Sequence, residues 1–163
     1  MSHHELGPED RTRASSWRLL ALLLALPLGA ACGDNQDPAG AEALWQALQE
    51  VDYRSWPRAP GYEERRGSNA PHGDKVDIYI NDVLAEALAS GESLERWPNG
   101  SVIVKDGFDG GDLELVAAME KRLTGWYWVE YAAGGEAIYS GSPETCTDCH
   151  KSGDDYVRAF ELP

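Results

Sequence analysis

The sequence predicts an α+β domain, mainly an antiparallel β sheet with two or three short helices packed beside it. The chain has 163 residues, of which 42% are hydrophobic and 26% are charged, as is ordinary for one globular domain. Short runs of alternating or β-branched apolar residues follow one another between turn residues, which is typical of antiparallel strands. A few other segments carry the apolar spacing of helices.

The first 31 residues have the pattern of a secretory signal. Arg11, Arg13 and Arg18 precede an apolar run of ten residues from Leu19 to Leu28. Ten residues rise only about 15 Å as a helix, which is too short to cross a bilayer core of about 30 Å. We therefore expect residues 1–31 to be an export signal and not a membrane anchor.

The stretch from Leu28 to Asp34 resembles a bacterial lipobox, whose cysteine is diacylated and becomes the mature N-terminus. Gly29 stands where that pattern usually has leucine. Acylation of Cys32 would make the mature protein a periplasmic lipoprotein that touches the membrane only through its lipid. The alternative is plain signal cleavage followed by an incidental cysteine. Residues 32–40 are then a flexible spacer, and the domain spans residues 41–163.

The first half of the domain begins with a helix and a long loop. Pro38 opens a helical pattern that places Leu44, Leu48 and Val51 on one stripe. Residues 53–74 are rich in Pro, Gly, Arg and Glu and predict a long ordered loop. Alternating apolar residues predict a strand over 75–80. Asn81 then caps a short helix that Gly91 ends.

The second half is a succession of strands. Residues 101–105 (SVIVK) form a β-branched strand between turns at 97–100 and 107–111. Residues 113–119 alternate as a strand, although the same stretch is compatible with a helix. Residues 125–131 (GWYWVEY) are the strongest strand pattern in the chain. The turn 132–135 leads that strand into a last one at 136–140.

Cys146, Cys149 and His150 form a C-x-x-C-H sequence, the attachment signature of a c-type haem. Two thiols at this spacing reach the two vinyl groups of one porphyrin edge, and the following imidazole is an axial ligand to the iron. An exported protein meets an oxidising compartment, so the alternative is a simple disulfide or redox pair beside an incidental histidine. We expect one covalently bound haem c.

The group on the opposite side of the iron decides what a haem protein does. The mature chain offers Met119 and His72 as sixth ligands. Met119 falls on the apolar face of a strand pattern, which favours a place in the core. His72 falls in a turn, where solvent or a structural hydrogen bond is its ordinary partner. Without either ligand the iron has an open distal site.

These features resemble the cytochrome P-460 family, which also contains the gas-binding cytochromes c′-beta. The resemblance extends from about Tyr53 to Val157 and rests on these segments in this order: Pro71-His72-Gly73, Tyr79-Ile80-Asn81, Pro98 to Lys105, Gly125-Trp126, the C-x-x-C-H sequence, and Asp155-Tyr156-Val157. It implies a small antiparallel β fold, usually a homodimer, that holds one c-type haem with a vacant distal face.

The resemblance also implies roles for two residues outside the C-x-x-C-H sequence. In the cross-linked members of the family a lysine amine bonds a porphyrin meso carbon, and that lysine matches Lys105. The alternative is a lysine at a strand end whose stem packs on apolar neighbours. Catalytic members oxidise hydroxylamine with the help of a distal carboxylate, for which Glu136 is the candidate. The alternative for Glu136 is a solvated charge on a hairpin.

The sequence therefore predicts an exported monohaem c-type cytochrome that acts on hydroxylamine or nitric oxide as an oxidoreductase. The 28 acidic residues against 14 basic ones give a formal net charge of −14, which excludes nucleic acid and favours a basic redox partner. One alternative is a haem module that binds nitric oxide or carbon monoxide without turnover. Another is simple electron transfer with Met119 or His72 as sixth ligand.

Overall fold

The computed structural model describes residues 36–69 and 71–163. The predicted export signal, the lipidation site Cys32 and the first part of the spacer lie outside the described residues. In the described part of the chain, no helix is long and apolar enough to cross a membrane.

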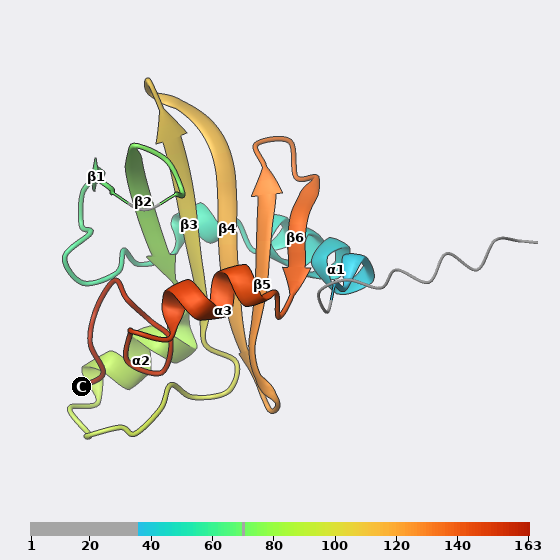
Figure 1. Ribbon diagram of the computed structural model, residues 1–163. Coiled ribbons are helices and arrows are strands. Elements are labelled where there is room, and N and C mark those ends of the chain that lie inside the picture. The colour runs from blue at the N-terminus through green and yellow to red at the C-terminus, as the bar shows by residue number, and fades with distance from the viewer. Residues whose placement is uncertain (1–35, 70) are drawn as a thin grey trace, which may run out of the picture. The chain divides into compact units, whose positions relative to one another are not determined.

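Six strands form one sheet in which every strand pairs antiparallel with its neighbours in the sequence (Figure 1). The elements are α1 (Pro38–Glu50), the 3-10 turn η1 (Tyr53–Ser55), β1 (Arg66–Gly67), β2 (Lys75–Ile80), α2 (Asp82–Ala89), β3 (Val102–Asp109), β4 (Asp112–Arg122), β5 (Gly125–Ala132), β6 (Ala137–Gly141) and α3 (Glu144–His150). The predicted α+β fold with a mainly antiparallel sheet is confirmed.

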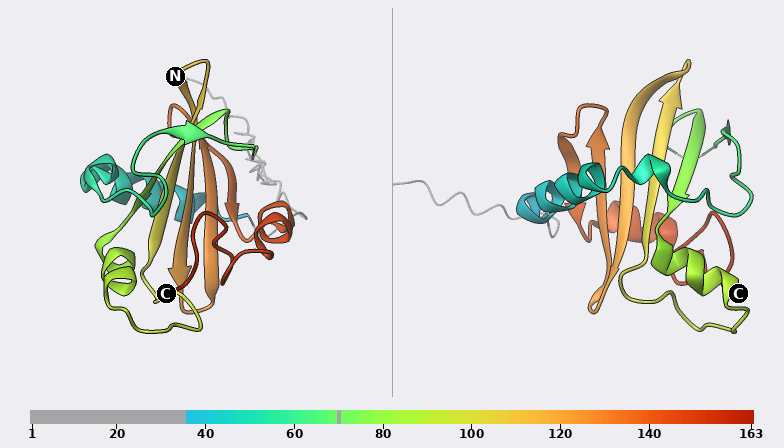
Figure 2. Two further views of the ribbon diagram at one scale, coloured as in Figure 1. Left: turned by 90° about the vertical axis from the view of Figure 1, so that its left-hand side faces the viewer. Right: turned by 180° about the vertical axis from the view of Figure 1, so that it is seen from behind.

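The two faces of the sheet bury separate apolar clusters, because successive side chains of a strand point to opposite faces. Figure 2 shows α1 and α3 on opposite faces of the sheet. The cluster on the α1 face contains Ala41, Leu44, Leu48, Tyr53, Tyr79, Val102, Val104, Val116, Ala118, Tyr127, Val129 and Tyr131. The cluster on the other face contains Ala59, Val76, Ile78, Ile80, Leu84, Trp97, Ile103, Met119, Trp126, Trp128 and Val157.

The strands differ from the predicted ones mainly in length. β2 has the predicted bounds, whereas β3 continues through Gly107 to Asp109, where a turn was predicted. The segment 113–119 is part of the strand β4 and not a helix, since both of its long neighbours bond to it along its length. The register across β3, β4 and β5 aligns Lys105, Ala117 and Glu130, which all lie within the predicted strands.

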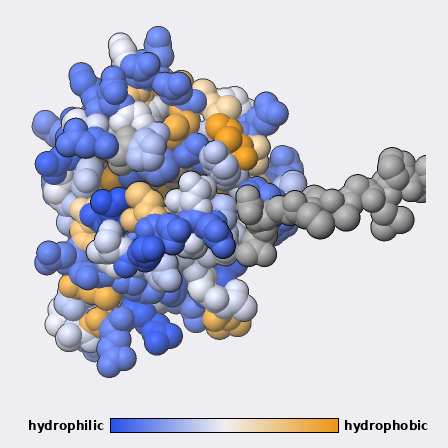
Figure 3. All heavy atoms as spheres, in the orientation of Figure 1, coloured by the Kyte–Doolittle hydropathy of each residue, from blue (hydrophilic) through white to orange (hydrophobic). Residues whose placement is uncertain are grey.

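The surface of the face that carries α3 is largely hydrophilic, with its hydrophobic side chains in small separate groups (Figure 3).

Candidate functional site

Three residues in one row of the sheet form the base of the site. Lys105 on β3 pairs with Ala117 on β4, which pairs with Glu130 on β5. Directly paired residues point to the same face, so the amine and the carboxylate flank a methyl group. Because Ala117 is small, space remains above it. The next row, Ile103, Met119 and Trp128, is apolar and buried.

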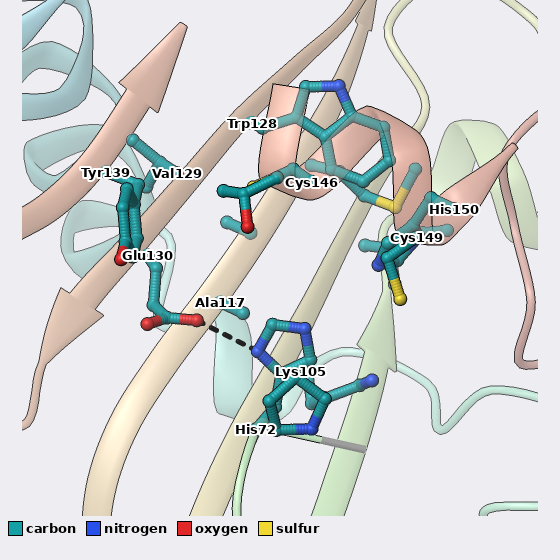
Figure 4. A pocket seen from close by; sticks show the side chains of 15 residues that line it. His72, Lys105, Ala117, Trp128, Val129, Glu130, Tyr139, Cys146, Cys149 and His150 are labelled. Carbon is teal, nitrogen blue, oxygen red and sulfur yellow. Dashed lines mark hydrogen bonds and ion pairs between the residues drawn. The ribbon is translucent and has the colours of Figure 1, made fainter. Parts of the chain in front are cut away.

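The helix α3 carries both cysteines and His150 over this base. A cavity of about 260 Å³ separates the helix from the strands and is lined by Cys146, Cys149 and His150 (Figure 4). Both thiols are free, Cys146 half-buried and Cys149 exposed. Burial raises the pKa of Cys146 to about 11, and the nearby Glu130 carboxylate acts in the same direction.

One ring nitrogen of His150 is hydrogen-bonded to the backbone, as is usual for a histidine that binds a metal through its other ring nitrogen. Its Nδ1 lies 3.0 Å from the carbonyl oxygen of Tyr156. A carbonyl only accepts, so Nδ1 carries the proton and Nε2 keeps its lone pair for a metal. Burial lowers the pKa of His150 to about 4, and the cations Lys105 and Arg158 also lower it. The ring is therefore neutral at pH 7, the form that binds a metal.

A buried ion pair between Asp155 and Lys121 holds the turn that carries the carbonyl of Tyr156. Asp155 and Tyr156 have left-handed backbones, with φ of 44° and 69°. The Asp155 carboxylate accepts from Lys121 Nζ at 2.7 and 2.8 Å and from the backbone N–H of Trp97 at 2.9 Å. The indole N–H of Trp126 donates to the Asp155 carbonyl at 2.6 Å. These contacts hold the turn that orients His150.

His72 enters the cavity from the connection before β2. Its Nδ1 lies 2.9 Å from Glu130 Oε2, and both side chains are less than one-fifth exposed. Two glycines permit this position. A Cβ at Gly107 would collide with the carbonyl oxygen of His72, and a Cβ at Gly73 would lie 2.7 Å from the backbone nitrogen of Phe108. The segment around His72 therefore lies directly on β3.

A second cavity, of about 440 Å³, adjoins the first and shares Lys105, His72 and His150 as lining residues. Arg66 and Arg158 also line it, so its walls are cationic although the whole chain is strongly acidic. Guanidinium groups form paired hydrogen bonds with carboxylates, such as the two propionate groups of a haem. Arg158 also contacts Cys149, with Nη1 3.0 Å from Sγ.

Lys105 lines both cavities, as a haem cross-link would require. Burial lowers the pKa of its amine, and the Arg158 charge lowers it further. Among the described residues the amine has no ion-pair partner. A lowered pKa increases the fraction of neutral, nucleophilic amine. The position is compatible with a cross-link, which stays a prediction.

The prediction for Glu136 needs correction, since this residue is exposed on the hairpin between β5 and β6 and lines neither cavity. Glu130 is the carboxylate in the cavity. The alternation of β5 puts Trp126, Trp128 and Glu130 on one face, which is the signal that could have identified it. Met119 is buried in the apolar cluster, as predicted.

The residues at the site fit a covalently bound haem. Two free thiols and an imidazole with an available Nε2 lie on one short helix, over apolar side chains and beside a cationic cavity. The second cavity, of about 440 Å³, lies within the range of about 300–1,000 Å³ that ligand pockets generally enclose, and the first, of about 260 Å³, adjoins it. Across residues 36–69 and 71–163, no group of three or more His, Cys, Asp or Glu side chains is arranged to hold a bare metal ion.

Comparison of the chain with family models, with curated proteins and with solved structures finds no match in any of the three. The resemblance to the cytochrome P-460 family therefore stays a prediction from the segments quoted above.

Proposed function

We propose that the protein is an exported c-type cytochrome that holds one haem through Cys146 and Cys149, with His150 as an axial ligand. One observation carries this proposal. Both thiols and His150, with its available Nε2, line the same cavity, which is apolar on the side of the strands and adjoins the second, cationic cavity lined by Arg66 and Arg158. A disulfide or redox pair would use the thiols but would give no role to His150 or to the cavities.

From the protein, the attachment would require only the two thiols of the helix α3, and the haem would supply the vinyl groups. Each thiol adds across a vinyl C=C bond, so that sulfur bonds to one carbon and the thiol hydrogen passes to the other. The addition is balanced without an oxidant. When bound, haem iron supplies a one-electron redox centre and a position for a small ligand.

We propose hydroxylamine or nitric oxide as that small ligand, which follows the family resemblance. Oxidation of hydroxylamine releases protons as well as electrons, so turnover needs a proton acceptor at the site and an electron-accepting protein. Glu130 takes the first role in place of Glu136, because its carboxylate lies in the cavity. The net charge of −14 favours a basic protein as electron acceptor.

Haem retention by cysteine variants tests the attachment. The protein is produced in a bacterial periplasm with a cytochrome c maturation system, and haem is stained after denaturing electrophoresis. We expect the wild type to retain haem, and the double variant Cys146→Ala/Cys149→Ala to lose it. Asp148→Ala, which replaces an exposed side chain between the two cysteines, is the matched control and should retain haem. A wild type that carries no haem under these conditions would refute the proposal.

A second candidate function, electron transfer by a six-coordinate haem, is favoured by one observation. The rings of His72 and His150 both line the first cavity, with centroids 6.3 Å apart and planes inclined by 57°. If His72 held the sixth position permanently, the protein would exchange electrons without binding small ligands. Carbon monoxide binding by the ferrous protein separates the two candidates.

A further inference from the structure

We propose that His72 is a second axial ligand, bound on the side of the iron opposite His150, and that a small ligand must displace it. This inference rests on the proposed function, because it presumes a haem at His150. It departs from the open distal site that the sequence predicts. Access to the iron is then controlled by a histidine from an irregular segment and not by a strand residue.

The separation of the two rings is that of two imidazoles on one metal ion. A bond between a first-row metal and an imidazole nitrogen is about 2.0–2.1 Å long. The ring centroid lies about 1.1 Å beyond that nitrogen, so two rings on opposite sides of one ion have centroids about 6.3 Å apart. The centroids of His72 and His150 are 6.3 Å apart, and the rings are inclined by 57°.

Hydrogen bonds give both rings the same tautomer. The Glu130 carboxylate accepts from Nδ1 of His72 at 2.9 Å, as the Tyr156 carbonyl accepts from Nδ1 of His150 at 3.0 Å. In both rings Nε2 then keeps its lone pair. In Figure 4 the edge of the His72 ring away from Glu130 points toward α3, across the cavity. A metal-bound histidine commonly donates the N–H of its other ring nitrogen to a carboxylate, as His72 does to Glu130.

Backbone contacts with β3 hold the segment that carries His72 at its distance from His150. Gly73 and Gly107 allow the segment to lie on β3, and the backbone N–H of Asp74 donates to the Phe108 carbonyl at 2.9 Å. Met119, the other sixth ligand that the sequence offers, also lines the first cavity, but it is only 7% exposed and packs in the apolar cluster with Ile103 and Trp128. The described residues therefore favour His72 over Met119.

Displacement of His72 would make binding of small ligands competitive. A small ligand can bind the iron only in the fraction of molecules from which His72 has dissociated. Its apparent affinity is therefore lower, and its association is slower, than at an open site. Replacement of His72 therefore increases the rate of carbon monoxide association with the ferrous protein.

Spectroscopy of the haem-loaded protein tests this inference. Absorption and electron paramagnetic resonance spectra are compared for the wild type, His72→Gly and the loop control Glu64→Gly, whose side chain is exposed. We expect low-spin, six-coordinate iron in the wild type and in the control, and high-spin iron in His72→Gly. Added imidazole should restore the low-spin spectrum of His72→Gly, which a merely structural role of His72 would not produce. Carbon monoxide should associate at least tenfold faster with His72→Gly.

Identical spin states in the wild type and His72→Gly would overturn the inference while leaving the haem attachment intact. Loss of haem stain from the wild type would instead refute the proposed function. The two failures are therefore distinguishable in the same preparations. A His72→Gly protein that is low-spin, and whose spectrum does not change with added imidazole, would indicate a different sixth ligand and would also overturn the inference.

Discussion

Replacement of Asp155 with alanine removes the partner of a buried lysine. The side chain of Lys121 is 9% exposed and that of Asp155 is 14% exposed, and two short contacts join the amine to the carboxylate. Without Asp155 the buried amine lies beside the Trp126 ring, 5.1 Å from the ring centroid, and loses its ion-pair partner. The backbone N–H of Trp97 also loses its acceptor.

The expected loss is a large fraction of the unfolding free energy of a typical domain, which is about 5–15 kcal/mol. Removal of one partner of a buried ion pair costs about 3–5 kcal/mol. The exposed pair of Asp148 and Lys151, with side chains 71% and 65% exposed, should contribute only about 0–1 kcal/mol. Asp148→Ala is therefore a matched control within the same region of the chain. With a slope of about 2 kcal/mol per molar urea, Asp155→Ala lowers the unfolding midpoint by about 1.5–2.5 M.

Urea unfolding followed by tryptophan fluorescence measures both variants. Asp155→Ala should also weaken the orientation of His150, because Asp155 holds the turn whose Tyr156 carbonyl accepts from that ring. Equal midpoints for Asp155→Ala and Asp148→Ala would refute the argument that the ion pair anchors the turn.

Three further predictions follow from the site and its surroundings. Gly107→Ala forces a Cβ onto the His72 carbonyl and should cost about 1–3 kcal/mol in urea unfolding, whereas Gly134→Ala, with nothing within 4 Å, should change little. Glu130→Gln should slow hydroxylamine oxidation by about 10²–10⁴-fold, and equal slowing by Glu136→Gln would contradict the choice of Glu130 as the proton acceptor. Burial raises the pKa of Tyr127 from 10.0 to about 12, so folding stability is retained below pH 10 and falls as the pH rises to 12. Tyr127→Phe should make that alkaline loss of stability smaller, and an unchanged pH profile would count against it.

Much of the fold could be predicted because local patterns and tertiary packing agree. β2 has the predicted bounds, and Asn81 caps α2 by accepting from the backbone N–H of Leu84. The end of β3 could not be predicted. Gly107 looks like a turn residue, but it lies within the strand because the backbone of His72 packs where its side chain would be. A contact between segments 35 residues apart decides that point.

The site could be predicted in part for a similar reason. Cys146, Cys149 and His150 are neighbours in the sequence, so their spacing alone placed them together. The position of Glu130 in the cavity depends on register across three strands, which the candidate Glu136 on the following hairpin does not share. The approach of His72 to Glu130 joins a loop to a strand 58 residues away. No local pattern carries that information.

Mass spectrometry of the peptide that contains Cys146 to His150 tests the central claim most directly. The peptide is taken from protein matured in a periplasm that attaches haem to other cytochromes. The account predicts one haem per peptide, bonded to both sulfur atoms and retained after acid and denaturant. A peptide of unmodified mass, or one lighter by the two hydrogens lost in a disulfide, would contradict the attachment of haem.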